Sequence, residues 1–594
     1  MFIDVCTYTV QGRTYTRHLL RESFREDGKV RHRTLANLSH ASSEEIQAMK
    51  LALKHKHNLQ QLGNVNEDIR VQQGLSVGAV ITLWQVAKRV GLVKALGNTQ
   101  NGKRALWQVF SRVIDQGSRL SATRLATSHA ACDVLGLDDF DEDDLYENLD
   151  WLAINQDRIE DKLFQSHYGS EKPELYLYDV TSSYFEGVCN ALAAFGYNRD
   201  GKKGKMQVVY GLLCDFQGRP ISIQAFPGNT VDTKTFGQQV HKVAQRFGDR
   251  PVTMVGDRGM IKGPQIEQLK AEKDHEFHYI TAITKSQIET LLKKEVVQLE
   301  LFDEIVSEVI SEDDVRYVLR RNPTRAAEMV ATRASKLASV QKLVNEQNTY
   351  LDEHPRASAK VAQKKVQKKW EKLRLPDVEI KCDDRTLSLS KKEDEWNEEA
   401  KLDGCYCLKT DLTKQQASKE TVHDRYKGLS QVEWAFRISK TIQLEARPIY
   451  VRKESRTRGH LFVVMLAYLL VQELAKSWNR IDATVAEGIN ELATLCTTQV
   501  TIKGVPILHN IPTPRASVQQ FLEAAEVKLP TKIANCGAIV STGPDPIACH
   551  TAMVRCCCFS RVCCEGGDTV SSAFNLVRSG AIHCQLMRRS QAIV

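Results

Sequence analysis

The sequence predicts an α/β protein in which helices pack on a mixed β-sheet, and two observations lead to this prediction. From about Pro173, apolar residues alternate with polar ones through three successive stretches, which is the two-residue period of β-strands. Beyond them, up to about residue 284, stretches with a helical period alternate with short apolar strands. Strands followed by alternating helices and strands indicate a sheet covered by helices.

The elements of this region follow in a definite order. ELYLYDVTSSYF, KMQVVYGLLCDF and RPISIQAF are three strands, with a turn at Asp215 to Gly218 between the last two. The helix TFGQQVHKVAQRF, the buried strand VTMVG, the helix GPQIEQLKAEK and the strand FHYITAI come next. This is the order expected of a ribonuclease-H-like core, here spanning residues 173–284.

Composition limits the class of protein. The 594 residues are 42% hydrophobic and 26% charged, which suits a globular chain of several domains rather than a disordered one. The net charge of +8 is small for this length, so any nucleic-acid surface must be local. The longest apolar run, Leu461 to Val471, is shorter than the about 20 residues of a membrane span. With no secretory signal at the N-terminus, we expect a cytoplasmic protein without membrane contact.

The N-terminal third divides into two regions. Residues 1–70 form a small basic strand-rich region, with a hairpin turn at Asp27-Gly28 and cations that suit either a solvated face or phosphate contacts. Residues 71–172 place apolar residues at helical spacing. This mainly helical region is expected either to bind DNA ends or to form a dimer.

Residues 285–402 interrupt the core as an inserted α+β subdomain. Its stretch 325–374 contains twelve Lys or Arg against five Asp or Glu, in a helical run broken near His354-Pro355. The strand-like pieces VEIKC and TLSLS follow, and core patterning resumes at GCYCLKTDL. Residues 403–510 are therefore the second part of the core. The basic helices suit a DNA contact or a solvated hairpin.

The C-terminal segment, 511–594, ends in an unusual tail. Eight of the sixteen cysteines fall in the last 59 residues. Those at 556–558 and 563–564 are contiguous rather than spaced as the C-x₂₋₄-C pairs of zinc sites, which disfavours a zinc module. The abrupt change of composition favours out-of-frame or read-through translation, so residues after about Lys532 are expected to be dispensable.

Three carboxylates are candidates for a metal site. Asp179 lies inside the first core strand and Asp257 directly after the strand VTMVG, so both can meet at one edge of the sheet. A carboxylate on an apolar strand is costly to bury unless it is paired or binds a cation, although caps and salt bridges offer the same relief. Glu433 lies on HDRYKGLSQVEWAFRISKTI, expected to be one amphipathic helix on which Tyr426, Glu433 and Lys440 share a face.

In these contexts Asp179, Asp257 and Glu433 resemble the DDE triad of bacterial insertion-sequence transposases. The similar branch carries a Y-R-E-K signature, with two, three and six residues between its members. Tyr426, Glu433 and Lys440 match that spacing, whereas Leu429 occupies the arginine position. Other segments of this sequence resemble the same branch, namely PGNTVD (227–232), DGCYCLKTDL (403–412) and RPIYVRKESRTRGHLFVVMLAYLL (447–470).

The resemblance implies a ribonuclease-H-like fold and a two-metal mechanism. Asp179 would bridge two Mg²⁺ (or Mn²⁺) ions, while Asp257 and Glu433 would each complete one. It also implies that Tyr426 and Lys440 bind DNA, and Arg437 and Arg258, which lie beside the triad in the sequence, are expected to do so too.

The function implied is cut-and-paste transposition of an insertion sequence. Its partners would be double-stranded DNA, as element ends and as target. The DNA complex would hold a homodimer, associated with the nucleoid when bound. Two alternatives stay open: a nuclease of the same fold without strand transfer, and a catalytically inactive DNA-binding derivative.

Overall fold

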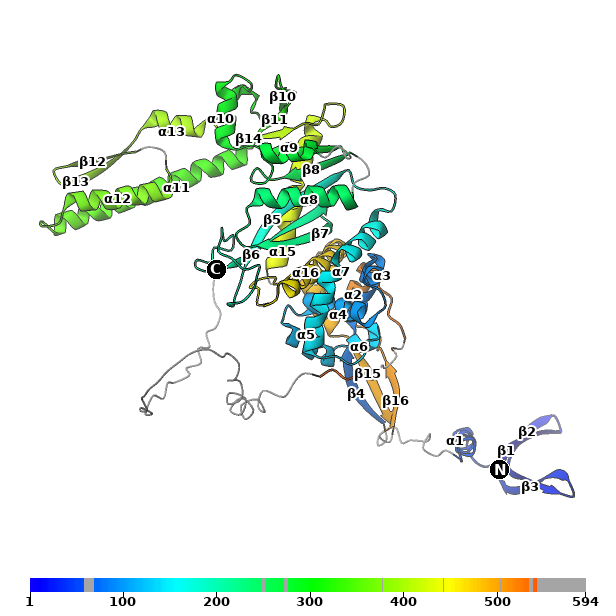
Figure 1. The fold of residues 1–594 in the computed structure, drawn as a ribbon. Coiled ribbons are helices and arrows are strands. Elements are labelled where there is room, and N and C mark those ends of the chain that lie inside the picture. Colours follow the sequence, from blue (N-terminus) through cyan, green and yellow to red (C-terminus); the bar gives the residue numbers. More distant parts are fainter. Residues whose placement is uncertain are drawn as a thin grey trace, which may run out of the picture. The chain divides into compact units, whose positions relative to one another are not determined.

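The computed structural model describes residues 1–57, 69–247, 251–271, 276–375, 378–441, 443–502, 505–531, 533 and 538–541 (Figure 1). The tail cysteines that were interpreted above (Cys536, Cys549, Cys556, Cys557, Cys558, Cys563, Cys564 and Cys584) lie outside these residues.

The N-terminal region is a three-stranded antiparallel meander followed by one helix. Its elements are β1 (Phe2–Val10), β2 (Arg13–Glu26), β3 (Lys29–Asn37) and α1 (Ser43–Lys54). Asp27 and Gly28, which connect β2 to β3, both have positive φ angles, as a two-residue hairpin turn requires. The predicted turn is confirmed. Ser42 and Glu45 form a capping box that starts α1.

The second region is mainly helical, as the apolar spacing predicted. It contains β4 (Ile69–Ser76), α2 (Gly78–Arg89), α3 (Leu92–Leu96), α4 (Gln100–Ile114), α5 (Arg119–Ser128), α6 (Ala131–Leu135) and α7 (Glu142–Tyr168). The side chains of Thr99, Ser118 and Asp141 accept hydrogen bonds from backbone N–H groups and so cap α4, α5 and α7.

The core elements occur in the predicted order. They are β5 (Leu175–Tyr184), β6 (Gln207–Asp215), β7 (Pro220–Pro227), α8 (Asp232–Arg246), β8 (Val252–Gly256), α9 (Gly263–Ala271) and β9 (Phe277–Ala282). Strands β5, β6 and β7 are antiparallel, and β8 and β9 run parallel to β5. The spatial order β9-β8-β5-β6-β7 is that of a ribonuclease-H-like sheet.

Strand β5 separates two hydrophobic layers. Leu175 and Leu177 belong to one cluster, which includes residues of α15 (Leu429–Lys440) and α16 (Glu454–Trp478). Tyr176 and Tyr178, on the opposite face, belong to a second cluster built with α8 and α9. Because side chains alternate along a strand, Asp179 lies on the face of Leu177, toward α15.

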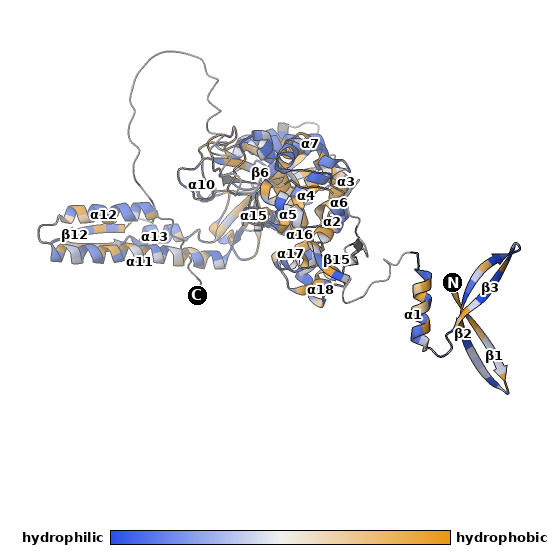
Figure 2. Ribbon diagram, turned by 90° about the horizontal axis from the view of Figure 1, so that it is seen from below, coloured by the Kyte–Doolittle hydropathy of each residue, from blue (hydrophilic) through white to orange (hydrophobic). Residues whose placement is uncertain are grey.

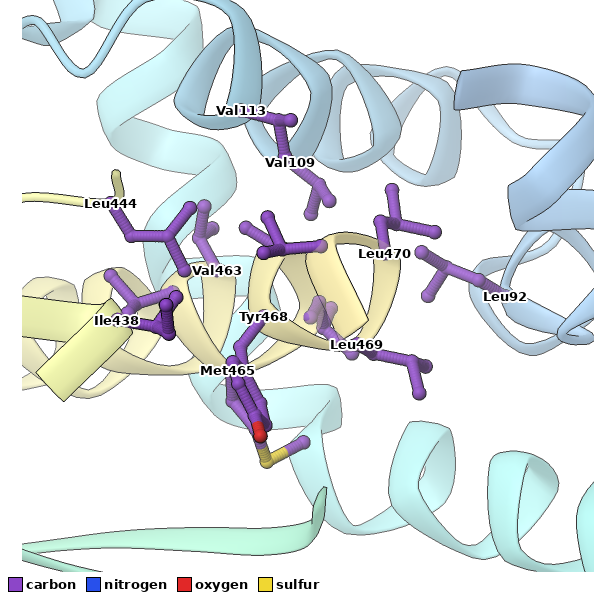
Figure 3. Close-up of a cluster of buried hydrophobic side chains, with 14 of the residues drawn as sticks. Leu92, Val109, Val113, Ile438, Leu444, Val463, Met465, Tyr468, Leu469 and Leu470 are labelled. Carbon is purple, nitrogen blue, oxygen red and sulfur yellow. The ribbon is translucent and has the colours of Figure 1, made fainter. Parts of the chain in front are cut away.

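Helix α16 is the centre of the larger cluster. Among the described helices, only Glu454–Ile481 has the length and apolar composition of a membrane span, and most of it is buried inside the protein. It packs against α4, α7 and β7. Figure 3 shows its contacts, drawn with Val463, Met465, Tyr468, Leu469 and Leu470 of α16, Val109 and Val113 of α4, Leu92 of α3 and Ile438 of α15.

The inserted segment both extends the core sheet and forms a helical arm. It contains α10 (Lys285–Lys293), η2 (Leu299–Leu301), β10 (Ser307–Ile310), β11 (Arg316–Arg321), α11 (Pro323–Glu353), α12 (Ala359–Leu373), β12 (Val378–Asp383), β13 (Thr386–Lys391) and α13 (Glu393–Ala400). The predicted break near His354-Pro355 separates α11 from α12. Helix α12 is largely hydrophilic (Figure 2). Strands β10 and β11 join the core sheet through β14 (Cys405–Thr410), which pairs with β9.

The chain then returns to the helical region. After α14 (Lys419–Lys427), α15 and α16 come η3 (Asn479–Ile481), α17 (Val485–Ala493), β15 (Cys496–Ile502), β16 (Val505–Asn510) and α18 (Ala516–Ala524). Strand β15 pairs with β4 rather than with the core sheet, and α17 packs on α2. Residues 403–510, grouped above as one part of the core, thus contribute to two sheets.

Residues 538–541 correct one expectation about the C-terminal segment. Val540 forms a β-bridge with Phe140, and the Ile539 N–H donates to Asp139 Oδ1 at 2.7 Å. Ala538 and Val540 also pack on the larger hydrophobic cluster. Residues after about Lys532 were expected to be dispensable because they show no period. Residues 538–541 nevertheless contact the folded protein, because a segment too short to show a period can still pair with an exposed backbone edge.

Candidate active site

Asp179 and Asp257 lie on neighbouring parallel strands. Tyr178 of β5 is in register with Gly256, the last residue of β8. Asp179 and Asp257 directly follow these two paired residues, and the charge of Asp257 acts on Asp179. The expected meeting of two carboxylates at this edge of the sheet therefore follows from strand order and register together.

Glu433 comes from α15, which packs on β5. Val432 and Phe436 are buried against the sheet, as predicted, while Glu433 is exposed. The predicted single helix is wrong, because α14 ends at Lys427 and α15 begins at Leu429. Gly428 joins them with helical torsion angles. A Cβ at Gly428 would lie 3.0 Å from Arg425 O and 3.5 Å from the Leu177 side chain, so glycine permits this close packing.

Leu429, in the arginine position of the signature, is 8% exposed and belongs to the larger hydrophobic cluster. Leu429 therefore packs in the hydrophobic core. Arg258 lies close enough to Tyr426 for its charge to lower the Tyr426 pKa, although burial and the Asp257 carboxylate raise that pKa overall. A cation is thus present beside the tyrosine without an arginine at position 429.

The three carboxylates influence each other electrostatically. Asp179 is half-buried, and its Oδ1 accepts a hydrogen bond from the Val180 N–H at 2.7 Å. Burial raises the pKa of Asp179 to about 7, and the negative charges of Asp257 and Glu433 add to the rise. A carboxylate held among like charges is stabilised by a bound cation.

The side chains expected to bind DNA lie in different environments. Tyr426 Oη donates to Asp257 Oδ1 over a long 3.5 Å. Arg258 and Arg437 are exposed. Lys440 is instead half-buried, with its Nζ 2.9 Å from Asp200 Oδ1.

Asp200 was not anticipated as a site residue. Its side chain is 1% exposed and also receives Arg447 Nη1 at 2.6 Å, while its Oδ2 accepts the Tyr184 N–H at 3.0 Å. It therefore ties the loop after β5 to the end of α15. The signal in the sequence was weak, because Asp200 stands in a glycine- and lysine-rich stretch (196–205) that suits a flexible turn equally well.

Arg199 forms a second link beside the first. Both oxygens of Asp232, at the start of α8, lie within 2.7 Å of Arg199 Nη2. Asp232 ends the segment PGNTVD, so the sequence did mark it, although not its partner. The charge of Arg199 also lowers the pKa of Asp179, against the larger effect of burial. The loop thus supplies positive charge to the carboxylate site.

The donor set suits a hard divalent cation. Carboxylate oxygens are preferred by Mg²⁺, which keeps several of its waters. Within the described ranges, no three His, Cys, Asp or Glu side chains lie close enough to hold one ion together. Asp257 and Glu433 are close enough to Asp179 for their charges to raise its pKa, so the three carboxylates lie in one electrostatic neighbourhood.

Comparisons with known proteins come from three sources. Residues 171–470 match the family "Transposase DDE domain", and residues 4–68 match "IS1634 family transposase, N-terminal domain". No curated protein sequence matches the chain. Among solved structures, the cryo-EM structure of the piggyBac transposase synaptic complex with hairpin DNA is similar at 8% identity and a TM-score of 0.35, over 70% of this chain and 76% of that one.

Proposed function

This chain belongs to the DDE transposase family of bacterial insertion sequences, an enzyme family that cleaves DNA and transfers strands with divalent metal ions, and from that premise we propose that Asp179, Asp257 and Glu433 are its catalytic and metal-binding residues. The observation that supports this assignment is the register of β5 and β8, whose last pair, Tyr178 and Gly256, directly precedes Asp179 and Asp257. Helix α15, packed on β5, contributes Glu433 from the same face.

The ions proposed are two Mg²⁺ or two Mn²⁺. Asp179, between the other two carboxylates, would be shared, and Asp257 and Glu433 would each hold one ion. When bound, such ions supply Lewis acidity to the scissile phosphate and activate the attacking water or 3′-hydroxyl.

The protein's own residues position the DNA strand and the acidic site. Tyr426 borders Asp257, and the exposed cations Arg258 and Arg437 offer charge to phosphates near the cut. Lys440 acts differently in this proposal. Paired with Asp200, it holds the loop after β5 against α15 and is a positioning residue.

The partners follow from the reaction. The protein binds double-stranded DNA, and we propose that the ends of its own element and a target site are both substrates in a cut-and-paste reaction. Residues 1–70 and the helical region 71–172 would bind the ends or form the dimer interface. A homodimer in the DNA complex would provide one active site for each end. Its proposed location is the cytoplasm, at the nucleoid when bound to DNA.

The test is cleavage of a duplex that carries the terminal inverted repeat of the element. Asp179→Ala, Asp257→Ala and Glu433→Ala should each abolish cleavage and strand transfer while keeping the affinity for the duplex, because phosphate contacts dominate binding. Glu420→Ala, an exposed carboxylate on α14, is the matched control and should cut normally. Full activity in any of the first three variants would refute the role of that residue.

A further inference from the structure

Two arginines are buried where the helical region meets the segment that follows α15. Arg112 of α4 and Arg119 of α5 are each 5% exposed. Arg112 Nη1 donates to the Gln116 carbonyl at 2.5 Å, and Arg119 Nη1 donates to Gln108 Oε1. Burying a guanidinium costs several kcal/mol unless an anion compensates it, roughly as for other ions.

These two cations are only partly compensated within the described part of the chain, because burial lowers the pKa of Arg112 by more than the charges of Glu445 and Asp115 raise it. Neither forms an ion pair with a carboxylate there, and Arg112 Nε is buried with no hydrogen-bond partner. Burial lowers the pKa of Arg112 to about 10 and that of Arg119 to about 9, and for Arg119 the charge of Arg112 adds to the fall. The two positive charges therefore oppose each other.

Both arginines line a cavity of about 290 Å³. Gln116, Ser118, Arg447 and His460 line it too. The ten-residue helix α5 begins at this wall, so its N-terminal partial positive charge adds to that of the arginines. Burial and both arginine charges hold the pKa of His460 well below its usual range, so the imidazole is a neutral polar group at physiological pH. Glu445, which is exposed, is the carboxylate in the lining.

We propose that this cavity binds a phosphate group, held by Arg112 and Arg119. Arginine recognises phosphate through paired N–H donors, and the unpartnered Arg112 Nε offers one of them. The proposal rests on the function proposed above in one respect only, since a DNA-binding enzyme makes a backbone phosphate the first candidate source. Free phosphate or a nucleotide carries the same chemistry.

The position of the cavity suits a phosphate away from the cut. Its wall residues Pro448 and Tyr450 flank Ile449, whose N–H donates to the Tyr184 carbonyl at 3.0 Å at the end of β5. Asp179 lies five residues earlier on the same strand, or about 17 Å at about 3.3 Å per residue. Successive phosphates of one DNA strand are about 3.4 Å apart along the axis, so the contact falls roughly five nucleotides from the scissile bond.

The first experiment measures thermal unfolding of the full chain in rising inorganic phosphate, with chloride at equal ionic strength as reference. The melting temperature of the wild type should rise and saturate. Arg112→Met should lose this response, with a half-saturating concentration at least about ten-fold higher. It should also melt no lower than the wild type without phosphate, because it removes a buried charge that Glu445 and Asp115 compensate only in part. Arg124→Met, an exposed position on α5, is the matched control and should respond like the wild type.

A second variant keeps the test decisive if Arg112→Met does not fold. Glu445→Gln removes the carboxylate from the lining at an exposed position, so half-saturation should occur at several-fold lower phosphate. Phosphate stabilisation that is unchanged in Glu445→Gln and in Arg112→Met, or absent from the wild type, would overturn the proposal. Asp179→Asn should retain the phosphate response, which separates this site from the proposed catalytic one.

The source of the phosphate is decided by duplex DNA. If a backbone phosphate occupies the cavity, Arg112→Met should weaken duplex binding about ten-fold and reduce the salt dependence by about one phosphate contact. A single neutral methylphosphonate, placed at successive positions, should weaken wild-type binding at one position roughly five nucleotides from the cut and leave Arg112→Met unaffected there. Unchanged duplex affinity together with stabilisation by inorganic phosphate would assign the cavity to free phosphate.

Discussion

Lys440 and Asp200 form an ion pair, with Nζ 2.9 Å from Oδ1, between the end of the helix that carries Glu433 and the loop that follows the strand of Asp179. The side chain of Lys440 is 11% exposed and that of Asp200 is 1% exposed, so water screens the ion pair little. Arg447 shares the same carboxylate oxygen. Two of the three proposed catalytic elements are therefore connected through a residue that bears no catalytic role itself.

Replacing Lys440 should affect both stability and cleavage. Lys440→Met should lower the free energy of unfolding by about 1–3 kcal/mol, because Asp200 stays buried with Arg447 as its remaining cation. Cleavage should fall while duplex affinity stays close to that of the wild type. The double variant Asp200→Asn/Lys440→Met should recover stability in thermal unfolding, and Lys427→Met, an exposed residue on α14, should change neither quantity. A single variant with wild-type stability and weakened duplex binding would return Lys440 to direct phosphate contact.

Stability of the metal-free protein should depend on pH through Asp179. Its pKa is raised from 3.8 to about 7 in the folded protein, so the folded state keeps this proton where the unfolded chain has lost it. The stabilisation that protonated Asp179 gives to the folded state is therefore present below about pH 4 and is lost as the pH rises toward 7. In the presence of a chelator, Asp179→Asn should gain melting temperature relative to the wild type at pH 8 but not at pH 4. An equal difference at both pH values would contradict this.

Metal stoichiometry should follow the proposed sharing of Asp179. Titration with Mn²⁺, followed by electron paramagnetic resonance, should give two ions in the wild type, one in Glu433→Ala and none in Asp179→Ala. Cleavage should require Mg²⁺ or Mn²⁺ and stop in excess chelator. Ca²⁺ should support DNA binding but little cutting, because its looser coordination positions the nucleophile poorly. One ion in the wild type would rule out the two-metal arrangement.

Tyr426 should matter for cleavage through its hydroxyl group. Tyr426→Phe removes the group that lies 3.5 Å from Asp257 Oδ1 and keeps the ring. Because that contact is long, the melting temperature should change by less than the equivalent of about 0.5 kcal/mol. The cleavage rate of an end duplex should fall several-fold, with Tyr350→Phe, an exposed tyrosine on α11, as control. A normal rate would make Tyr426 a packing residue.

Two truncations should separate the end of the described fold from the tail. A chain that ends at Ser541 should melt and cleave like the full chain and be more soluble without reductant, because it lacks the clustered thiols. A chain that ends at Lys532 loses the contacts of Ile539 and Ser541 with Asp139 and Phe140, and should be less stable by about 1–2 kcal/mol. If the chain that ends at Lys532 lost bound zinc and DNA binding, this result would instead support a zinc module in the tail.

Local sequence patterns were enough to predict most core elements and the family. The two-residue period of YLYDVTSSYF and the helical period of the segments after it are properties of neighbouring residues, and the structure has β5 to β9 in that order. The carboxylates Asp179, Asp257 and Glu433 could be selected because each stands in a recognisable local context. Even the misjudged helix was locally correct, since Gly428 keeps helical torsion angles between α14 and α15.

Which distant side chains meet could be seen from the packed structure alone. Asp200 and Lys440 are 240 positions apart, and nothing in the glycine-rich stretch around Asp200 indicates that it is buried. Arg112 and Arg119 fit ordinary amphipathic helices, and their burial becomes visible once the helices pack around them. Periodicity along the chain shows which face of a helix or strand is buried. Ion pairs and cavities depend instead on which elements become neighbours. Sheet order and helix packing choose these neighbours through contacts between residues far apart in the chain.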